Sequence, residues 1–217
     1  MNKKLRAAIL DDHLVTVEGY VAILEKDPQI EVVARMGYGD ELESTLRAHP
    51  ADVLILDVSV PTSPENRNPY PILYVVPKLL DAHPNLKIIV ISMHADRGLI
   101  RAVMEAGASG YILKDDQSVL GNLTNVLKTI DSEGIQFSRI THDIYARHVS
   151  VDSNKLSSRE SQVLSLSAAF PNDTTADLAR RLSISNSTVR NLLSRAYLKL
   201  EVNNRTAAIA KAREQGL

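Results

Sequence analysis

The sequence has no cysteine among its 217 residues, and it has no apolar segment long enough to cross a membrane. Without cysteine, the protein can form neither disulfide bonds nor metal sites with thiolate ligands. The apolar run before Asp11 is too short for a signal peptide or a membrane span, so we expect a cytoplasmic protein without a membrane partner. Internal repeats are absent too, and the content of 44% hydrophobic and 24% charged residues is typical of a globular protein.

The chain also lacks a large net charge, but its two parts differ strongly. The whole sequence carries a net charge of −1 at pH 7. From Lys155 onward ten basic residues stand against five acidic ones, a net charge of +5, whereas residues 1–154 hold 15 basic and 21 acidic residues, a net charge of −6. An acidic first part joined to a basic last part predicts an anionic partner, plausibly nucleic acid, for the C-terminal domain.

Short apolar runs alternate with amphipathic segments over the first two-thirds of the chain. The apolar runs cover residues 5–10, 30–34, 53–56, 88–91 and 110–113, and the helix-like segments cover 14–26, 40–48, 72–82, 97–106 and 117–132. Five such repeats predict an α/β domain, residues 1–133, with a doubly wound, five-stranded parallel sheet. Residues 134–154 lack this periodicity, and we expect a linker there with a short helix near 143–148.

Polar side chains stand where four of the predicted strands end. In chain order they are Asp11 with Asp12, Asp57, Ser92 and Lys114. Ligands of parallel sheets bind outside the carboxyl ends of the strands, so we expect these groups to form one pocket. Carboxylates suit Mg²⁺ and can accept a phosphoryl group, whose charge a lysine and a hydroxyl would stabilise. Taken singly, the acid pair is more often a helix cap and the lysine a solvated side chain, but their joint placement favours a pocket.

Four motifs carry a family resemblance: ILDDH, LILDVSVP, VISMH and GASGYILK. With them, residues 5–130 resemble the receiver domain of two-component response regulators, which has a flavodoxin-like fold. The resemblance implies that Asp57 accepts a phosphoryl group from a histidine kinase and that Lys114 stabilises it. It implies a Mg²⁺ site made by Asp11, Asp12, Asp57 and the backbone of Ser59. It also implies a switch pair, Ser92 and Tyr111, in which the tyrosine turns inward when the serine moves onto the phosphoryl oxygen.

One stretch departs from that family. After Pro61 relatives usually have a short loop with glycine, whereas this chain continues with TSPENRNPYPILYVVPKLL, which has four prolines and no glycine. We expect a longer, stiffer loop that alters access to Asp57 or the choice of kinase, with a tolerated surface insertion as the alternative. Pro77 is expected to kink or restart the following helix, because it lacks an N–H and clashes with the preceding turn. Ser59 and His94 flank the pocket, at positions that tune phosphoryl lifetime in relatives.

The C-terminal segment, residues 155–217, has only helical patterns. Ser157 or Ser158 can cap the first helix and Thr174 or Thr175 the second. The turn SIS then leads into a third helix, residues 186–200, and two helices joined by about three residues are typical of a helix-turn-helix.

The third helix has two distinct faces on a helical wheel. An apolar stripe is formed by Val189, Leu192, Leu193, Ala196 and Leu200. The opposite face holds Ser187, Asn191, Ser194 and Leu198, flanked by Arg190 and Arg195. Arginine can pair with guanine and asparagine with adenine, so this face suits the major groove of DNA. An ordinary solvated helix face is the alternative reading.

The same segment resembles the four-helix DNA-binding domain of the LuxR/FixJ type, on the motifs LSSRESQVL, ADLARRLSIS, STVRNLLSRAYLKL and NNRTAA. The resemblance implies base contacts by Arg190, Asn191 and Ser194 and phosphate contacts by Thr188 and Arg205, and Arg195 completes the expected DNA-binding set. Leu192 and Ser194 replace residues that are often histidine and lysine in relatives, which predicts weaker phosphate anchoring.

The two resemblances together indicate a NarL/FixJ-type transcriptional response regulator rather than an enzyme, apart from assistance to its own phosphotransfer and dephosphorylation. Phosphorylation would release the DNA-binding domain or favour a homodimer on double-stranded promoter DNA. The expected dimer surfaces are the helix near 97–106, the strand bearing Tyr111 and the helix near 117–132. Alternatives are a phosphorylation-independent or ligand-controlled regulator and an auxiliary partner of another regulator. A phosphatase of the haloacid dehalogenase type would usually carry aspartate where Ser59 stands.

Overall fold

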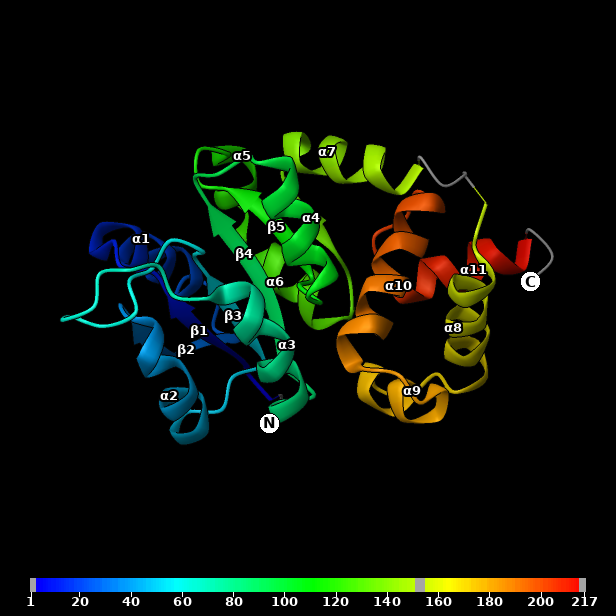
Figure 1. Cartoon of the computed structure of the whole chain (residues 1–217), viewed down its shortest axis with the longest axis horizontal. Coiled ribbons are helices and arrows are strands. Elements are labelled where there is room, and N and C mark those ends of the chain that lie inside the picture. The colour runs from blue at the N-terminus through cyan, green and yellow to red at the C-terminus, as the bar shows by residue number, and fades with distance from the viewer. Residues whose placement is uncertain (1–2, 151–154, 215–217) are drawn as a thin grey trace.

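The first domain is built on a sheet of six parallel strands. The computed structural model describes residues 3–150 and 155–214 (Figure 1). In the spatial order of the sheet the strands are β2 (Ile30–Met36), β1 (Leu5–Leu10), β3 (Val53–Leu56), β4 (Lys87–Ser92), β5 (Gly110–Leu113) and β6 (Gln136–Phe137). The doubly wound parallel sheet is therefore confirmed, with one short strand more than the five predicted.

Helices cover both faces of the sheet, as strands that are apolar on both faces require. One buried cluster joins the sheet to α1 (Leu14–Leu24) and α6 (Leu123–Asp131). The other joins it to α2 (Leu42–Ala48), α3 (Ile72–Ala82) and α4 (Arg97–Glu105). Two smaller helices complete this part, η1 (Gly39–Glu41) and α5 (Gln117–Leu120). The single helix predicted over 117–132 is thus divided between α5 and α6.

Pro77 does not restart the helix in which it lies. α3 runs from Ile72 to Ala82 with this proline inside. Its apolar face, which includes Val76 and Leu79, is buried in the core. Burial of that face outweighs the lost backbone hydrogen bond, so the prediction of a restart was wrong.

The expected linker is largely an ordered part of the first domain. β6 pairs with β5, and α7 (Arg139–Ser150) follows it and contacts α4 and β5. Figure 1 shows α7 reaching from the sheet domain toward the second domain. Residues 151–154 of the expected linker lie outside the described residues.

The second domain is the predicted arrangement of four helices: α8 (Ser158–Ala169), α9 (Thr175–Leu182), α10 (Asn186–Lys199) and α11 (Arg205–Glu214). The hydroxyls of Ser157, Thr174 and Ser185 cap the first three of these helices by accepting backbone N–H groups. Ser183 adopts a left-handed conformation (φ 53°) and ends α9, so that α10 can start in a new direction.

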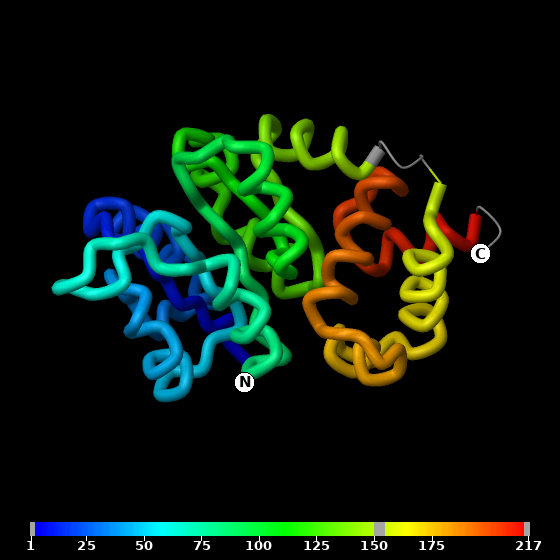
Figure 2. The backbone as a smooth tube through the Cα atoms, in the orientation of Figure 1, coloured from blue at the N-terminus to red at the C-terminus, as the bar shows by residue number. Residues whose placement is uncertain are grey.

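The two domains meet along α10. This helix contacts α3, α4 and α7 of the first domain, while its other side packs on α8, α9 and α11 (Figure 2). Over residues 3–150 and 155–214, none of the helices is both long and apolar enough to cross a membrane.

Candidate functional site: an acidic pocket and a buried recognition helix

Asp57 lies in a pocket at the carboxyl edge of the sheet, as predicted. Its backbone N–H donates to the carbonyl oxygen of Leu10, which brings it beside Asp11. Lys114 Nζ lies 2.7 Å from Asp11 Oδ2 and 2.7 Å from Asp57 Oδ2. The two carboxylates are buried, with only 1% and 4% of their side-chain surfaces exposed. Three groups from the ends of three strands therefore form one ion-paired cluster, here called the acidic pocket.

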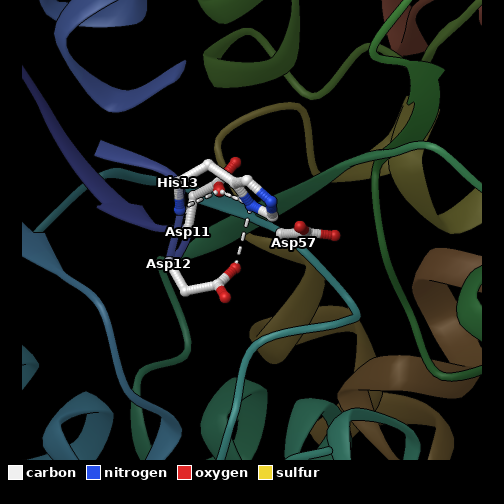
Figure 3. Close-up of side chains that lie close together, drawn as sticks. All are labelled: Asp11, Asp12, His13 and Asp57. Atoms are coloured by element: carbon white, nitrogen blue, oxygen red, sulfur yellow. Dashed lines mark hydrogen bonds and ion pairs between the residues drawn. The ribbon is translucent and has the colours of Figure 1, made fainter. Parts of the chain in front are cut away.

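Asp12 and His13 complete the rim of the acidic pocket (Figure 3). His13 Nδ1 lies 3.0 Å from Asp12 Oδ1 and 3.3 Å from Asp11 Oδ1. One possible ligand atom from each of Asp11, Asp12, His13 and Asp57 lies within 4.8 Å of all the others. The three carboxylates are the hard oxygen ligands that Mg²⁺ prefers, so the residues fit this ion. His13 was not among the predicted site residues, although its place directly after the acid pair in ILDDH was a usable signal.

The charges of the pocket hold Lys114 in its ionised form. Burial alone would lower the pKa of this ammonium group. Hydrogen bonds to the carboxylates of Asp11 and Asp57 outweigh burial and raise the pKa of Lys114 above its ordinary value. A protonated lysine at this point can neutralise negative charge that develops on a group bound to Asp57.

Ser92 and Tyr111 are linked through the main chain of His94. The His94 N–H donates to Ser92 Oγ over 3.2 Å, and the Tyr111 hydroxyl donates to the His94 carbonyl oxygen over 2.8 Å. Tyr111 is fully buried, and burial raises its pKa. The resemblance implied a ring that turns inward on phosphorylation, but the ring already lies inward because it packs in one cluster with Tyr145 and Val149 of α7.

Ser59 and His94 form a hydrogen bond across the pocket. Ser59 Oγ lies 3.0 Å from His94 Nε2, and the Ser59 N–H donates to Asp57 Oδ1 over 3.3 Å. The main chain of Ser59 therefore lies beside Asp57, as its expected role in metal binding requires.

The proline-rich segment after Pro61 is an ordered hairpin. Pro61 and Pro69 form an antiparallel bridge, and the Thr62 N–H donates to the Asn68 carbonyl oxygen. The hairpin is attached to η1, where a Cβ on Gly39 would lie 2.0 Å from a ring carbon of Tyr70. Only glycine allows this contact, so the hairpin packs closely against η1.

The helix predicted to read DNA, α10, turns that face toward the first domain. Arg190 is 7% exposed, and its guanidinium donates to the carbonyl oxygens of Pro84 (3.1 Å) and Leu86 (2.9 Å) in the turn between α3 and β4. Asn186 Nδ2 donates to the carbonyl oxygen of Leu80 in α3. Asn191 Oδ1 accepts a hydrogen bond from the Tyr145 hydroxyl over 3.2 Å. Of the residues expected at the bases, Arg190 and Asn191 thus have receiver partners, and Ser194 is buried.

The remaining predicted DNA contacts fall into two groups. Thr188 is exposed at the start of α10. Arg195 Nε lies 3.3 Å from the buried Glu160 carboxylate. Arg205 is buried and donates to the carbonyl oxygen of Asp173. Arg195 therefore joins α10 to α8, Arg205 joins α11 to the loop before α9, and among these three only Thr188 is exposed.

The comparisons with known proteins assign the family. The model of the response regulator receiver domain matches residues 7–125, and the model of the bacterial regulatory proteins of the luxR family matches residues 154–212. The chain belongs to the response regulators that join a receiver domain to a LuxR-type DNA-binding domain.

Individual relatives cover both domains. The transcriptional regulatory protein DesR of Bacillus subtilis (strain 168) is 30% identical over 209 residues, which is 96% of each chain. DegU of Brevibacillus brevis is 27% identical and covers 98% of this chain and 94% of its own. Among solved structures, RcsB of Salmonella enterica serovar Typhimurium, bound to promoter P1flhDC in the presence of the phosphomimetic BeF₃⁻, is 25% identical, with a TM-score of 0.58 over 97% of this chain and 98% of that one.

Proposed function

We propose that this transcriptional regulator is switched by phosphorylation of Asp57 and that the switch controls the exposure of α10. The observation that carries the proposal is that the receiver occupies the face of α10 that would read bases. Arg190 and Asn191 cannot contact a base edge while they bond to the receiver. DNA binding therefore requires the two domains to separate, which favours domain release as the first consequence of phosphorylation.

The groups of the acidic pocket support the phosphotransfer step. The Asp57 carboxylate would attack the phosphorus atom of a phosphohistidine of the kinase, and the P–N bond would break as the P–O bond forms. Lys114 would leave Asp11 and follow the transferred phosphoryl group, and Ser92 would donate a hydrogen bond to it. Mg²⁺, held by Asp11, Asp12 and Asp57, would supply positive charge to the phosphoryl oxygens.

A homodimer is part of the proposed function. One released DNA-binding domain reads one half-site, so a twofold promoter site needs two chains. An RcsB structure with two dimers bound to two parallel DNAs supports this arrangement in a protein of the same fold. In this chain α7 contacts α4 and β5, so part of those two expected dimer surfaces is covered.

The test measures the intact mass of the chain, to detect phosphorylation, and its affinity for DNA, to detect the switch. The native chain and Asp57→Asn are incubated with Mg²⁺ and acetyl phosphate, and intact mass reports the adduct. One phosphoryl group on the native chain alone, together with tighter binding to duplexes selected from a random pool, is the expected result. Absence of a phosphoryl adduct, together with a DNA affinity that beryllofluoride does not change, would favour the phosphorylation-independent regulator instead.

A further inference from the structure

The start of α7 is bonded to the main chain of the switch tyrosine. The carbonyl oxygen of Tyr111 accepts hydrogen bonds from the Ser138 N–H (3.2 Å) and from the Thr141 hydroxyl (2.7 Å). Ser138 Oγ accepts a hydrogen bond from the Leu113 N–H (2.8 Å). Ser138 and Thr141 are buried, so water cannot easily replace these bonds. A displacement of β5 near Tyr111 therefore has to displace α7 as well.

The middle of α7 is bonded to the recognition helix. Tyr145 is 1% exposed and its ring stacks on Phe137 with a centroid distance of 5.7 Å. Its hydroxyl donates to Asn191 Oδ1 over 3.2 Å, one of the atoms expected to face a base. Tyr145 lies four residues after Thr141, one turn further along the same face of α7.

These contacts form one continuous connection from the acidic pocket to α10. Ser92 Oγ accepts from the N–H of His94, whose carbonyl oxygen accepts from the Tyr111 hydroxyl. The connection continues from the carbonyl oxygen of Tyr111 through Thr141 and one turn of helix to Tyr145. A helix transmits a displacement over one turn with little loss, because its backbone hydrogen bonds keep it rigid.

We propose that α7 is the coupling element between the phosphorylation site and the recognition helix, with Thr141 and Tyr145 as its two positioning residues. When Ser92 moves onto the phosphoryl group it displaces the main chain of His94 and thereby Tyr111. α7 moves with Tyr111, the bond between Tyr145 and Asn191 breaks, and α10 loses one of its contacts with the receiver. This inference rests on the proposed function, since it describes how that switch reaches the DNA-binding domain.

Two conservative variants of the full chain test the connection. Thr141→Val removes the hydroxyl but keeps the branched shape, and Tyr145→Phe removes the hydroxyl but keeps the stacked ring. The matched control is Tyr74→Phe, an exposed tyrosine near the start of α3. Thermal unfolding shows that each variant folds, and intact mass after acetyl phosphate shows that Asp57 still accepts the phosphoryl group. The readout is the ratio of DNA affinities with and without phosphorylation.

Tyr145→Phe is expected to raise the DNA affinity of the unphosphorylated chain about 2- to 10-fold, because the closed form loses its hydrogen bond to Asn191. Thr141→Val leaves that bond in place but uncouples α7 from Tyr111, so phosphorylation no longer breaks the bond and the phosphorylated chain is expected to bind DNA about 2- to 10-fold more weakly. The phosphorylated Tyr145→Phe chain keeps its DNA affinity, so the ratio of affinities narrows in both variants, while Tyr74→Phe leaves the ratio unchanged. Because both substitutions break the same connection, the double variant is expected to narrow the ratio no further than the stronger single variant. An unchanged ratio in both single variants overturns the coupling role of α7. So does a double variant that narrows the ratio by the product of the two single factors.

The proposed function can fail separately. If the native chain takes no phosphoryl group, or if its DNA affinity does not change on phosphorylation, then the proposed switch is overturned before any variant is compared. A native chain that responds, beside variants that respond equally, overturns only the inference about α7.

Discussion

In the proposed function Arg190 takes part in two competing complexes, the closed chain and the DNA complex, and its replacement by alanine should weaken both. In the closed chain its guanidinium bonds to the carbonyl oxygens of Pro84 and Leu86, and burial lowers its pKa. On DNA the same donors can pair with guanine. Arg190→Ala therefore weakens both the DNA complex and the closed form. The observed DNA affinity then depends on whether the free chain is closed or open before it binds.

The magnitudes give a specific expectation. Loss of a bidentate base contact costs about 1–3 kcal/mol, which is roughly 5- to 150-fold in affinity. In the closed form the substitution removes the hydrogen bonds to the carbonyl oxygens of Pro84 and Leu86 in a buried interface, at a cost of about 1–3 kcal/mol. The phosphorylated chain, which is open in the proposed switch, should lose DNA affinity by the full factor. The unphosphorylated chain should change much less, because the two losses offset each other.

The assay is fluorescence anisotropy on a selected duplex, with acetyl phosphate and without it, at several salt concentrations. Arg159→Ala, an exposed arginine on α8, controls for the lost charge, and Arg190→Lys keeps the charge but loses the fork of donors. Unchanged affinity of the phosphorylated Arg190→Ala chain would remove this residue from base reading. An equal loss in both states would refute the idea that its bonds to the receiver stabilise the closed form.

Three further predictions concern the receiver. Lys114→Gln leaves two buried carboxylates without their cation and should lower the free energy of unfolding by about 3 kcal/mol; Mg²⁺ should raise its melting temperature more than that of the native chain, and equal shifts would contradict this. Bonds from Arg6 and Lys3 outweigh burial and lower the pKa of Asp52 to about 2, so its stabilisation is complete above the unfolded pKa of 3.8 and is lost as pH falls toward 2. Asp52→Asn should therefore cost about 2 kcal/mol at pH 7 in denaturant titrations and almost nothing at pH 2; a constant difference would refute the assignment. Deletion of residues 63–68, with a Gly-Gly closure, should change the rate of phosphorylation by a kinase more than the rate with acetyl phosphate; an equal change with both donors would make the hairpin a passive insertion.

The acidic pocket could be predicted from sequence because it depends on a rule of topology. Once the apolar runs are assigned to parallel strands, the ends of the strands at Asp11, Asp57 and Lys114 must meet at one edge. No side-chain conformation is needed for that step. The inward position of Tyr111 could not be predicted in this way, since it depends on what packs outside β5.

The partner of the recognition helix could not be predicted from the helical wheel. A polar face flanked by arginines has the same pattern whether it meets DNA, water or a second domain, and here Arg190 meets carbonyl oxygens. α7 was predicted only as a short helix within a linker, for a related reason. Its side chains buried by the receiver, Thr141, Tyr145 and Val149, are spaced by four residues, but only one of them is aliphatic. Such a helix has little apolar periodicity, so it resembled a linker.

The burial of α10 against the receiver has a consequence for the phosphorylation site itself. Suppose that the phosphoryl group weakens that contact and so raises the affinity for a ligand that holds α10 away from the receiver. Thermodynamic reciprocity then requires this ligand to favour the phosphorylated form by the same factor. Promoter DNA is such a ligand. A chain already bound at its operator should hold beryllofluoride more tightly than a chain free in solution, so the promoter acts as an effector of the receiver as well as its target.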